Sequence, residues 1–226
     1  FFLARHFGAP SGYIGLYRAN QSGSAQLIDW LRMNQAVPIP TSPVYAVASG
    51  FVCYQFIEQN KEPRIYQISS GSKGALLDID GSGFESQPTH FVSNGTDRIC
   101  FAASTSGDGR ELWTTNGSAG TTTLLADVVP GSGSSNPSSL IMARGHPGVF
   151  FQAENGTLRD LYFANAEASP VLKFCVSAVQ NSSQHTMASG TDLAYINQVS
   201  GGFQLCLADG KPDGTTIGTR IVTLLH

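Results

Sequence analysis

Asparagines followed two positions later by serine or threonine are the most frequent chemical signal in this sequence. Five such triplets have no proline in the middle, and they begin at Asn20, Asn94, Asn116, Asn155 and Asn181. Each falls in a segment that predicts a turn, where an attached glycan would stay in solvent. Because Asn-Gly is also a favoured hairpin turn, a purely structural role is the alternative. We treat the five asparagines as candidate N-glycosylation sites.

A second motif with possible chemistry is acidic. The segment Asp78-Ile79-Asp80-Gly81 resembles the front of a calcium-binding loop, but the closing glutamate at the required spacing is missing. Asp78 also aligns with Asp127, a turn position of the repeat described below. Calcium at Asp78 and Asp80 is therefore a secondary alternative, and we expect no cofactor.

The four cysteines show neither a C-x-x-C motif nor a spacing typical of zinc sites. Cys53 and Cys100 occupy the same place in two successive repeats, so their side chains point the same way and do not face each other. We expect both to be buried free thiols. Cys175 and Cys206 fall in neighbouring repeats and form a candidate disulfide.

Sequence patterns of several enzyme classes are absent. The chain has no G-x-S-x-G elbow, no P-loop and no G-x-G-x-x-G. Acidic residues are scattered, whereas a glycoside hydrolase needs carboxylates that converge on one site. We expect no catalytic residue, with a propeller glycoside hydrolase as the less favoured alternative.

The elements that position these residues repeat along the chain. A pair of residues recurs at intervals of 44 to 49 positions, as Leu16-Tyr17, Ile65-Tyr66, Leu112-Trp113, Leu161-Tyr162 and Leu205-Cys206. Three further apolar runs recur around most of these pairs, separated by Gly, Asn, Ser and Pro. Short apolar runs between such breakers predict strands. Four strands in a repeat of this length are typical of a β-propeller blade.

We therefore predict an all-β fold, a β-propeller of four-stranded blades with five repeats visible. The first repeat lacks the run that would form its inner strand. We expect residues 1–226 to form a single domain and to be an incomplete record of a longer chain. An irregular β-sandwich is the alternative, but four columns in register argue against it.

One stretch carries a specific resemblance. Residues 109–121 read GRELWTTNGSAGT and continue to Pro130-Gly131. This stretch resembles the ELWxTDGTxxGT repeats of extracellular and surface proteins, which themselves resemble propeller blades. Asn116-Gly117-Ser118 stands where the family usually has Asp-Gly-Thr. The resemblance covers the whole chain in period but about one repeat in detail. It implies secretion, adhesion or surface layers, and it carries no catalytic residue.

Candidate ligand contacts follow from the propeller arrangement, in which inner strands line a central channel. His90 and His185 share an inner-strand column with Tyr45 and Leu140. Two histidines are too few for a metal site, which needs three or four ligands. Trp30, near the end of a strand, is a candidate exposed aromatic residue that could stack on a sugar ring. The ligand-contact candidates are thus Trp30, Tyr45, His90 and His185.

The amino-acid composition limits the classes of partner that we expect this chain to bind. Charged residues make up 13% of the 226 positions and the net charge is −3, which argues against nucleic-acid binding. No apolar run reaches the roughly 18 residues of a membrane span. We expect a non-catalytic secreted or cell-surface interaction module, adhesive or carbohydrate-binding (lectin-like), whose partners are glycans or extracellular matrix and surface proteins. The alternative is a structural glycoprotein subunit of an extracellular layer or filament that assembles with itself.

The glycoprotein hypothesis predicts the mass of the native chain. Mass spectrometry before and after enzymatic N-glycan removal should show a decrease, against a protein mass of 23.9 kDa. An unchanged mass that matches this sequence would contradict both the glycans and the incomplete record. A deglycosylated mass well above 23.9 kDa would show that blades or domains are missing from the record.

Overall fold

The computed structural model describes residues 1–4, 13–32, 45–55, 63–81, 86–142, 148–156, 158–165, 168–173, 187–189, 192–199, 202–212 and 217–225. The described residues form nineteen β-strands and one short 3-10 turn, Ala119–Thr121. All strand pairs are antiparallel, which confirms the predicted all-β class.

The strands form five sheets, each built from consecutive strands. Sheet 1 contains β1 (Phe2–Ala4), β2 (Tyr13–Ala19) and β3 (Ala25–Arg32), and sheet 2 contains β4 (Tyr45–Val47), β5 (Phe51–Gln55), β6 (Pro63–Gln67) and β7 (Ser72–Leu76). Sheet 3 contains β8 (Thr89–Ser93), β9 (Ile99–Thr105), β10 (Gly109–Thr115) and β11 (Thr123–Ala126). Sheet 4 contains β12 (Ser138–Met142), β13 (Gly148–Asn155), β14 (Leu158–Asn165) and β15 (Ala168–Lys173). Sheet 5 contains β16 (Met187–Ser189), β17 (Asp192–Val199), β18 (Gly202–Pro212) and β19 (Ile217–Leu225).

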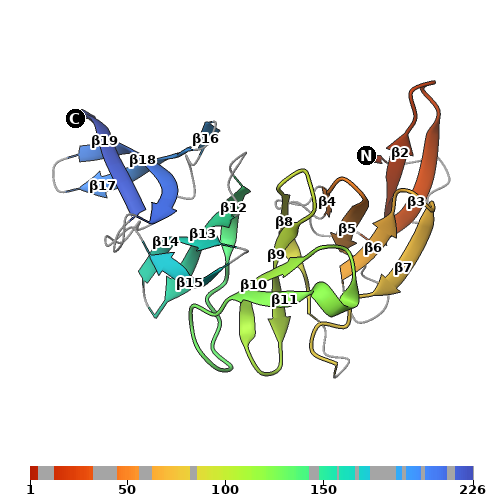
Figure 1. Cartoon of the computed structure of the whole chain (residues 1–226), viewed down its shortest axis with the longest axis horizontal. Helices are drawn as coiled ribbons and strands as arrows, with labels where there is room; N and C mark the ends of the chain where they lie inside the picture. The colour runs from red at the N-terminus through yellow and green to blue at the C-terminus, as the bar shows by residue number, and fades with distance from the viewer. Residues whose placement is uncertain are drawn as a thin grey trace.

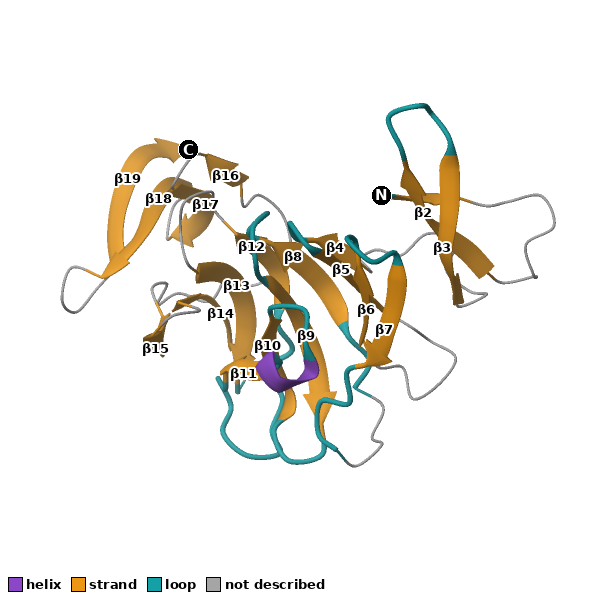
Figure 2. Cartoon of the chain, turned by 45° about the vertical axis from the view of Figure 1, so that its right-hand side comes forward, coloured by secondary structure: helices purple, strands orange, loops and turns teal. Residues whose placement is uncertain are grey.

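These five sheets match the five predicted repeats, and in the described part of the chain sheet 1 has three strands rather than four. The sheets follow one another along an arc in chain order, with sheets 1 and 5 at its two ends (Figures 1 and 2). The first strands of the four-stranded sheets lie along the inside of the arc, where β8 has β4 on one side and β12 on the other.

The second strand of each central sheet is buried on both faces. Phe51 to Tyr54 and Val149 to Phe151 are all at most 5% exposed. Val52 and Tyr54 pack against sheet 1, whereas Phe51 and Cys53, which point the opposite way, pack against sheet 3. A strand in a sheet that is covered on both faces therefore has apolar residues at successive positions instead of alternating ones.

The two described cysteine side chains follow the same rule. Cys53 is buried between sheets 2 and 3, and Cys100 between sheets 3 and 4, so they occupy different interfaces. Both are free, as predicted, and burial raises the pKa of the Cys100 thiol to about 11. Cys175 lies outside the described residues, so its disulfide with Cys206 stays a prediction.

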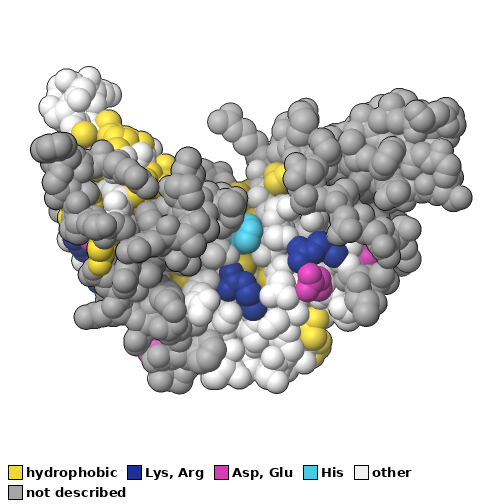
Figure 3. Space-filling model, turned by 180° about the vertical axis from the view of Figure 1, so that it is seen from behind, with side chains coloured by type: hydrophobic (Ala, Val, Ile, Leu, Met, Phe, Trp, Pro, Cys, Tyr) yellow, Lys and Arg dark blue, Asp and Glu magenta, His cyan; other side chains and the backbone are white. Residues whose placement is uncertain are grey.

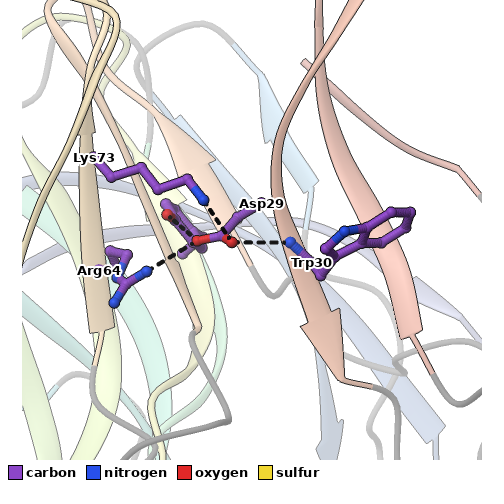
Figure 4. A network of polar contacts seen from close by, with 5 residues as sticks. Asp29, Trp30, Arg64 and Lys73 are labelled. Carbon is purple, nitrogen blue, oxygen red and sulfur yellow. Dashed lines mark hydrogen bonds and ion pairs between the residues drawn. The ribbon is translucent and has the colours of Figure 1, made fainter. Parts of the chain in front are cut away.

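A buried carboxylate joins sheets 1 and 2 (Figure 4). Asp29 on β3 is 6% exposed and accepts hydrogen bonds from the Tyr54 hydroxyl at 2.9 Å and the Trp30 backbone N–H at 3.0 Å. Its two oxygens also form ion pairs with Arg64 at 3.1 Å and Lys73 at 3.0 Å. Because all but Trp30 come from sheet 2, the network fixes how one sheet sits on the next.

Replacing this carboxylate should weaken the interface. Asp29→Asn keeps the side-chain shape but removes the negative charge that pairs with Arg64 and Lys73, and we expect a loss of about 3 kcal/mol in the free energy of unfolding. Lys73→Met is the control, because Lys73 is half exposed and its removal should cost less than about 1 kcal/mol. Chemical denaturation measures both. Equal losses for the two variants would contradict a structural role of the buried pair.

Candidate functional site

The inner strands β8 and β12 contain matching irregularities. The pairing register shifts between Thr89 and Val92 in β8, and between Ser138 and Ile141 in β12. Inside these shifts, His90 has φ = 58° and Ser139 has φ = 52°. Positive φ is uncommon for residues other than glycine and costs on the order of 1–3 kcal/mol. Bulges of this kind redirect side chains and often lie beside functional sites.

The segments that lead into these strands match as well. Gln87 and Asn136, each followed by proline, have φ values of 45° and 49°. The backbone therefore repeats the same unusual path at the start of two neighbouring inner strands. Sequence alignment of the repeats placed Leu140 in the column of His90, but the shared conformation places Ser139 there. The predicted column used a spacing of 50 residues, whereas Ser139 lies 49 residues after His90, the spacing that also separates Arg110 from Arg159.

An arginine from the third strand holds each bulge. The Arg110 guanidinium on β10 donates to the Thr89 hydroxyl, and the Arg159 guanidinium on β14 donates to the Ser138 hydroxyl. Thr89 and Ser138 each directly precede the positive-φ residue of their strand. The same arginine-to-hydroxyl contact thus recurs in sheets 3 and 4.

The two arginines differ in how their charge is compensated. Arg159 forms an ion pair with Glu154, and Glu154 also accepts a hydrogen bond from the Asn136 side chain at 3.0 Å. Arg110, by contrast, donates only to uncharged oxygens, which include the Gln87 carbonyl at 2.9 Å. Among the described residues, no carboxylate lies within ion-pair distance of Arg110.

His90 lies beside both arginines. Its Nδ1 atom is 2.8 Å from the Thr89 hydroxyl, which already accepts a hydrogen bond from Arg110. The hydroxyl hydrogen is free to point to Nδ1, and in that arrangement neutral His90 carries its proton on Nε2. Burial lowers the pKa of His90, and Arg110 and Arg159 lower it further by charge repulsion.

Figure 3 shows how this chemistry lies on the surface. A histidine side chain lies near the middle of this view, below the notch between the two ends of the arc, with Lys or Arg side chains on two sides of it. An acidic side chain lies next to one of these cationic groups. The only histidine in the described part of the chain is His90. This face is therefore polar and mainly cationic at its centre.

A buried glutamate positions the loop that leads into β12. Glu111 on β10 is fully buried and accepts hydrogen bonds from the Ser135 backbone N–H at 2.8 Å, the Ser135 hydroxyl at 2.5 Å and the Val128 N–H at 3.1 Å. Burial raises the pKa of Glu111 despite these hydrogen bonds. A Cβ atom on Gly109 would lie 1.7 Å from the Gly133 carbonyl oxygen, so this loop also requires glycine.

These contacts give the Gly-Arg-Glu segment of residues 109–111 a physical role. Gly109 leaves space for the loop at Gly133. Arg110 donates a hydrogen bond to the bulge of β8, and Glu111 accepts one from Ser135 just before β12. In the sequence this segment is recognisable as part of a repeat, but its spacing alone reveals none of these contacts. The recurrence of arginine at 110 and 159, on equivalent strands, was the signal that could have found the site.

The structure does not place all of the predicted ligand-contact residues next to one another. Tyr45 on β4 and His90 on β8 lie on neighbouring inner strands, and the Tyr45 hydroxyl donates to the Phe1 carbonyl at 3.3 Å. Trp30 lies half-buried on β3, the last strand of sheet 1, away from the inner strands. His185 lies outside the described residues.

The described sequons lie at turns between strands. Asn20, Asn116 and Asn155 are exposed. Asn94 is half-buried, and its side-chain oxygen accepts hydrogen bonds from three backbone N–H groups of the turn, while its amide donates to Asp97. Asn94 therefore has a structural role that the exposed ones share only in part. Asn181 lies outside the described residues.

The two acidic residues of the calcium alternative are engaged in local structure. Asp78 accepts a hydrogen bond from the Gly81 N–H at 2.9 Å, and Asp80 accepts two from Ser106. No group of three or more His, Cys, Asp or Glu side chains suited to a metal occurs within the residues that the structure describes. Calcium at this turn would need ligands from elsewhere in the chain.

The environment of His90 predicts its titration. The imidazole pKa should lie below its ordinary value of 6.5, and Arg159→Gln should move it upward by removing one positive charge. In the folded protein this lowered pKa contributes stability above pH 6.5 that is lost as the pH falls through the window below it. NMR of the histidine Cε1–H signals, assigned with His90→Asn, measures the midpoint. A midpoint at or above 6.5 would contradict the described surroundings.

Comparisons with known proteins address the fold. No family model and no curated protein matches the sequence. TolB from Acinetobacter baumannii is 18% identical with a TM-score of 0.48, over 98% of this chain and 52% of TolB. A chain from a structural and mechanistic analysis of two prolyl endopeptidases is 10% identical with a TM-score of 0.55, over 95% of this chain and 31% of that one. Both are of propeller type, and the second likeness shows that this chain has a propeller-type arrangement of sheets.

Within the described residues, no helix is long and apolar enough to cross a membrane. The chain spans about half the length of TolB and about a third of the length of the prolyl endopeptidase chain. At these identities the likeness concerns the fold alone.

Proposed function

We propose that the chain is a non-catalytic, extracellular or cell-surface interaction module that binds saccharides through the inner face of a β-propeller. The observation that carries the proposal is the pair of matching bulges at His90 and Ser139, on two neighbouring inner strands of the arc. Binding sites commonly combine such a rigid scaffold with a few placed polar groups. The extracellular setting rests on the repeat resemblance and the sequons in exposed turns.

The chemistry of the surface fits saccharides. Around the bulges lie hydroxyl and amide side chains of Thr89, Ser138, Ser139 and Asn136, most of them held by other side chains. Sugars present many hydroxyl groups that pair with such fixed donors and acceptors. Aromatic rings add an apolar surface for the sugar C–H face, and Tyr45 lies on the adjacent inner strand.

We further propose that the five sheets are five blades of a ring. The face of sheet 1 that points away from sheet 2 carries an apolar row, because Phe2 pairs with Tyr17 and Tyr17 pairs with Leu27 across three strands. Phe2 and Leu27 are 38% and 37% exposed and are the large apolar side chains left most open in the described residues. A neighbouring sheet on this face would bury them, as occurs at each interior interface.

The same exposed row favours the second candidate function, a structural subunit of an extracellular layer or filament. In that case the partner on sheet 1 would be another copy of the chain instead of sheet 5. Self-association in sedimentation experiments separates this candidate from the closed ring.

A glycan array of neutral and acidic oligosaccharides, followed by calorimetry of the bound sugars, tests the function. We expect binding that Ser139→Gly weakens three- to tenfold, since glycine keeps the positive φ but removes a hydroxyl worth about 1 kcal/mol as a hydrogen-bonding group. Ser69→Gly, in the exposed turn between β6 and β7, should leave affinity unchanged. Absence of any saccharide binding at millimolar concentration, together with self-association, would instead favour the structural candidate.

A further inference from the structure

An uncompensated charge distinguishes the surface around His90. Arg110 is partly buried, and burial lowers its pKa, so its positive charge is held at a cost. The described residues supply it with hydroxyl and carbonyl oxygens but no carboxylate. Partly buried charges are normally paired. A bound anion would therefore compensate the positive charge of Arg110.

His90 supplies a second donor group close to Arg110, since both side chains contact the Thr89 hydroxyl. The Thr89 hydroxyl links Arg110 to Nδ1 of His90, and when this hydroxyl donates to Nδ1 the His90 proton is on Nε2. Among the described residues, Nε2 has no hydrogen-bond partner. Neutral His90 can therefore donate to an anionic oxygen, and the proton that it gains at lower pH adds a charge of the favourable sign.

Arg159 completes the cationic group from the neighbouring sheet. Its charge acts on His90, and it is half exposed and paired with Glu154. The charged groups around His90 are therefore Arg110 from β10 and Arg159 from β14, with Glu154 of β13 bound to Arg159. An incoming anion would share Arg159 with Glu154, so the net charge that it meets remains positive.

We propose that His90, Arg110 and Arg159 bind the carboxylate or sulfate group of an acidic saccharide. The inference rests on the proposed saccharide-binding function and names the class of sugar. The remaining groups at the bulges, Ser139 and Asn136 among them, are neutral hydrogen-bonding groups suited to sugar hydroxyls. An acidic peptide would gain little from them beyond its charge, which favours a saccharide as the source of the anion.

Calorimetric titration of the chain tests the proposal with four probes: a sulfated disaccharide, its neutral parent, inorganic sulfate and an acidic peptide of equal charge. The sulfated sugar should bind at least tenfold more tightly than its parent. Arg159→Gln should raise its Kd at least tenfold, and His90→Asn three- to tenfold, since asparagine tolerates positive φ. Arg18→Gln is the matched control, because it removes one positive charge from β2, where Arg18 donates to the Ile68 carbonyl. Its effect should stay below twofold.

NMR supplies a readout that a purely structural role would not move. Saturation with the sulfated disaccharide or with inorganic sulfate should raise the pKa of His90, because the bound anion offsets the two arginines. Circular dichroism confirms that each variant folds. If Arg159→Gln fails to fold, His90→Asn and the His90 titration decide the result.

Several outcomes would overturn the proposal. Equal weakening by Arg159→Gln and Arg18→Gln would show attraction by net charge alone. Equal binding of the acidic peptide through the same residues would show that the ligand is a peptide. Equal binding of the neutral parent, with the His90 signal unmoved, would refute the anion site while the saccharide function stands. No binding of any sugar would refute both.

Discussion

The burial of both faces of each sheet is the constraint on which the rest of this structure depends. A four-stranded sheet with apolar residues on both sides cannot be stable alone, so each interior sheet packs between two others. Val52 and Tyr54 face one neighbour while Phe51 and Cys53 face the next. This stacking places the first strands of the sheets side by side on the inside of an arc (Figure 1). It also leaves an apolar row on sheet 1, where the described arc ends.

The packed sheets allow the inner strands to hold a strained conformation. Backbone strain persists where surrounding structure fixes it more than once. At β8 and β12 that support comes from Arg110 and Arg159, each bonded to the hydroxyl beside a positive-φ residue. Glu111 adds a further link, since it holds the loop that leads into the bulge of β12. The polar surface is thus built from repeat positions, but its residues differ from sheet to sheet.

Much of the architecture could be predicted from the sequence, because the period and the turn residues depend on local chemistry. Four strands per repeat, the shortened first sheet and the free thiols of Cys53 and Cys100 all follow from spacing. The site could be predicted only in part. His90 stood out, but the contact of Arg110 with Thr89 joins residues 21 positions apart and depends on register. An alignment that is off by one residue puts Leu140 in the place of Ser139, which the matching bulges of β8 and β12 identify as the equivalent of His90. Asp29 was missed because nothing local reveals its partners on another sheet.

We propose that the polar inner face, built on paired bulges, is where a ligand binds. A crystal structure of the chain soaked with a sulfated disaccharide tests it most directly. We expect density for the sulfate group between His90 Nε2 and the guanidinium groups of Arg110 and Arg159, with sugar hydroxyls near Ser139. An empty inner face, or a sugar bound only at the outer strands around Trp30, would contradict it.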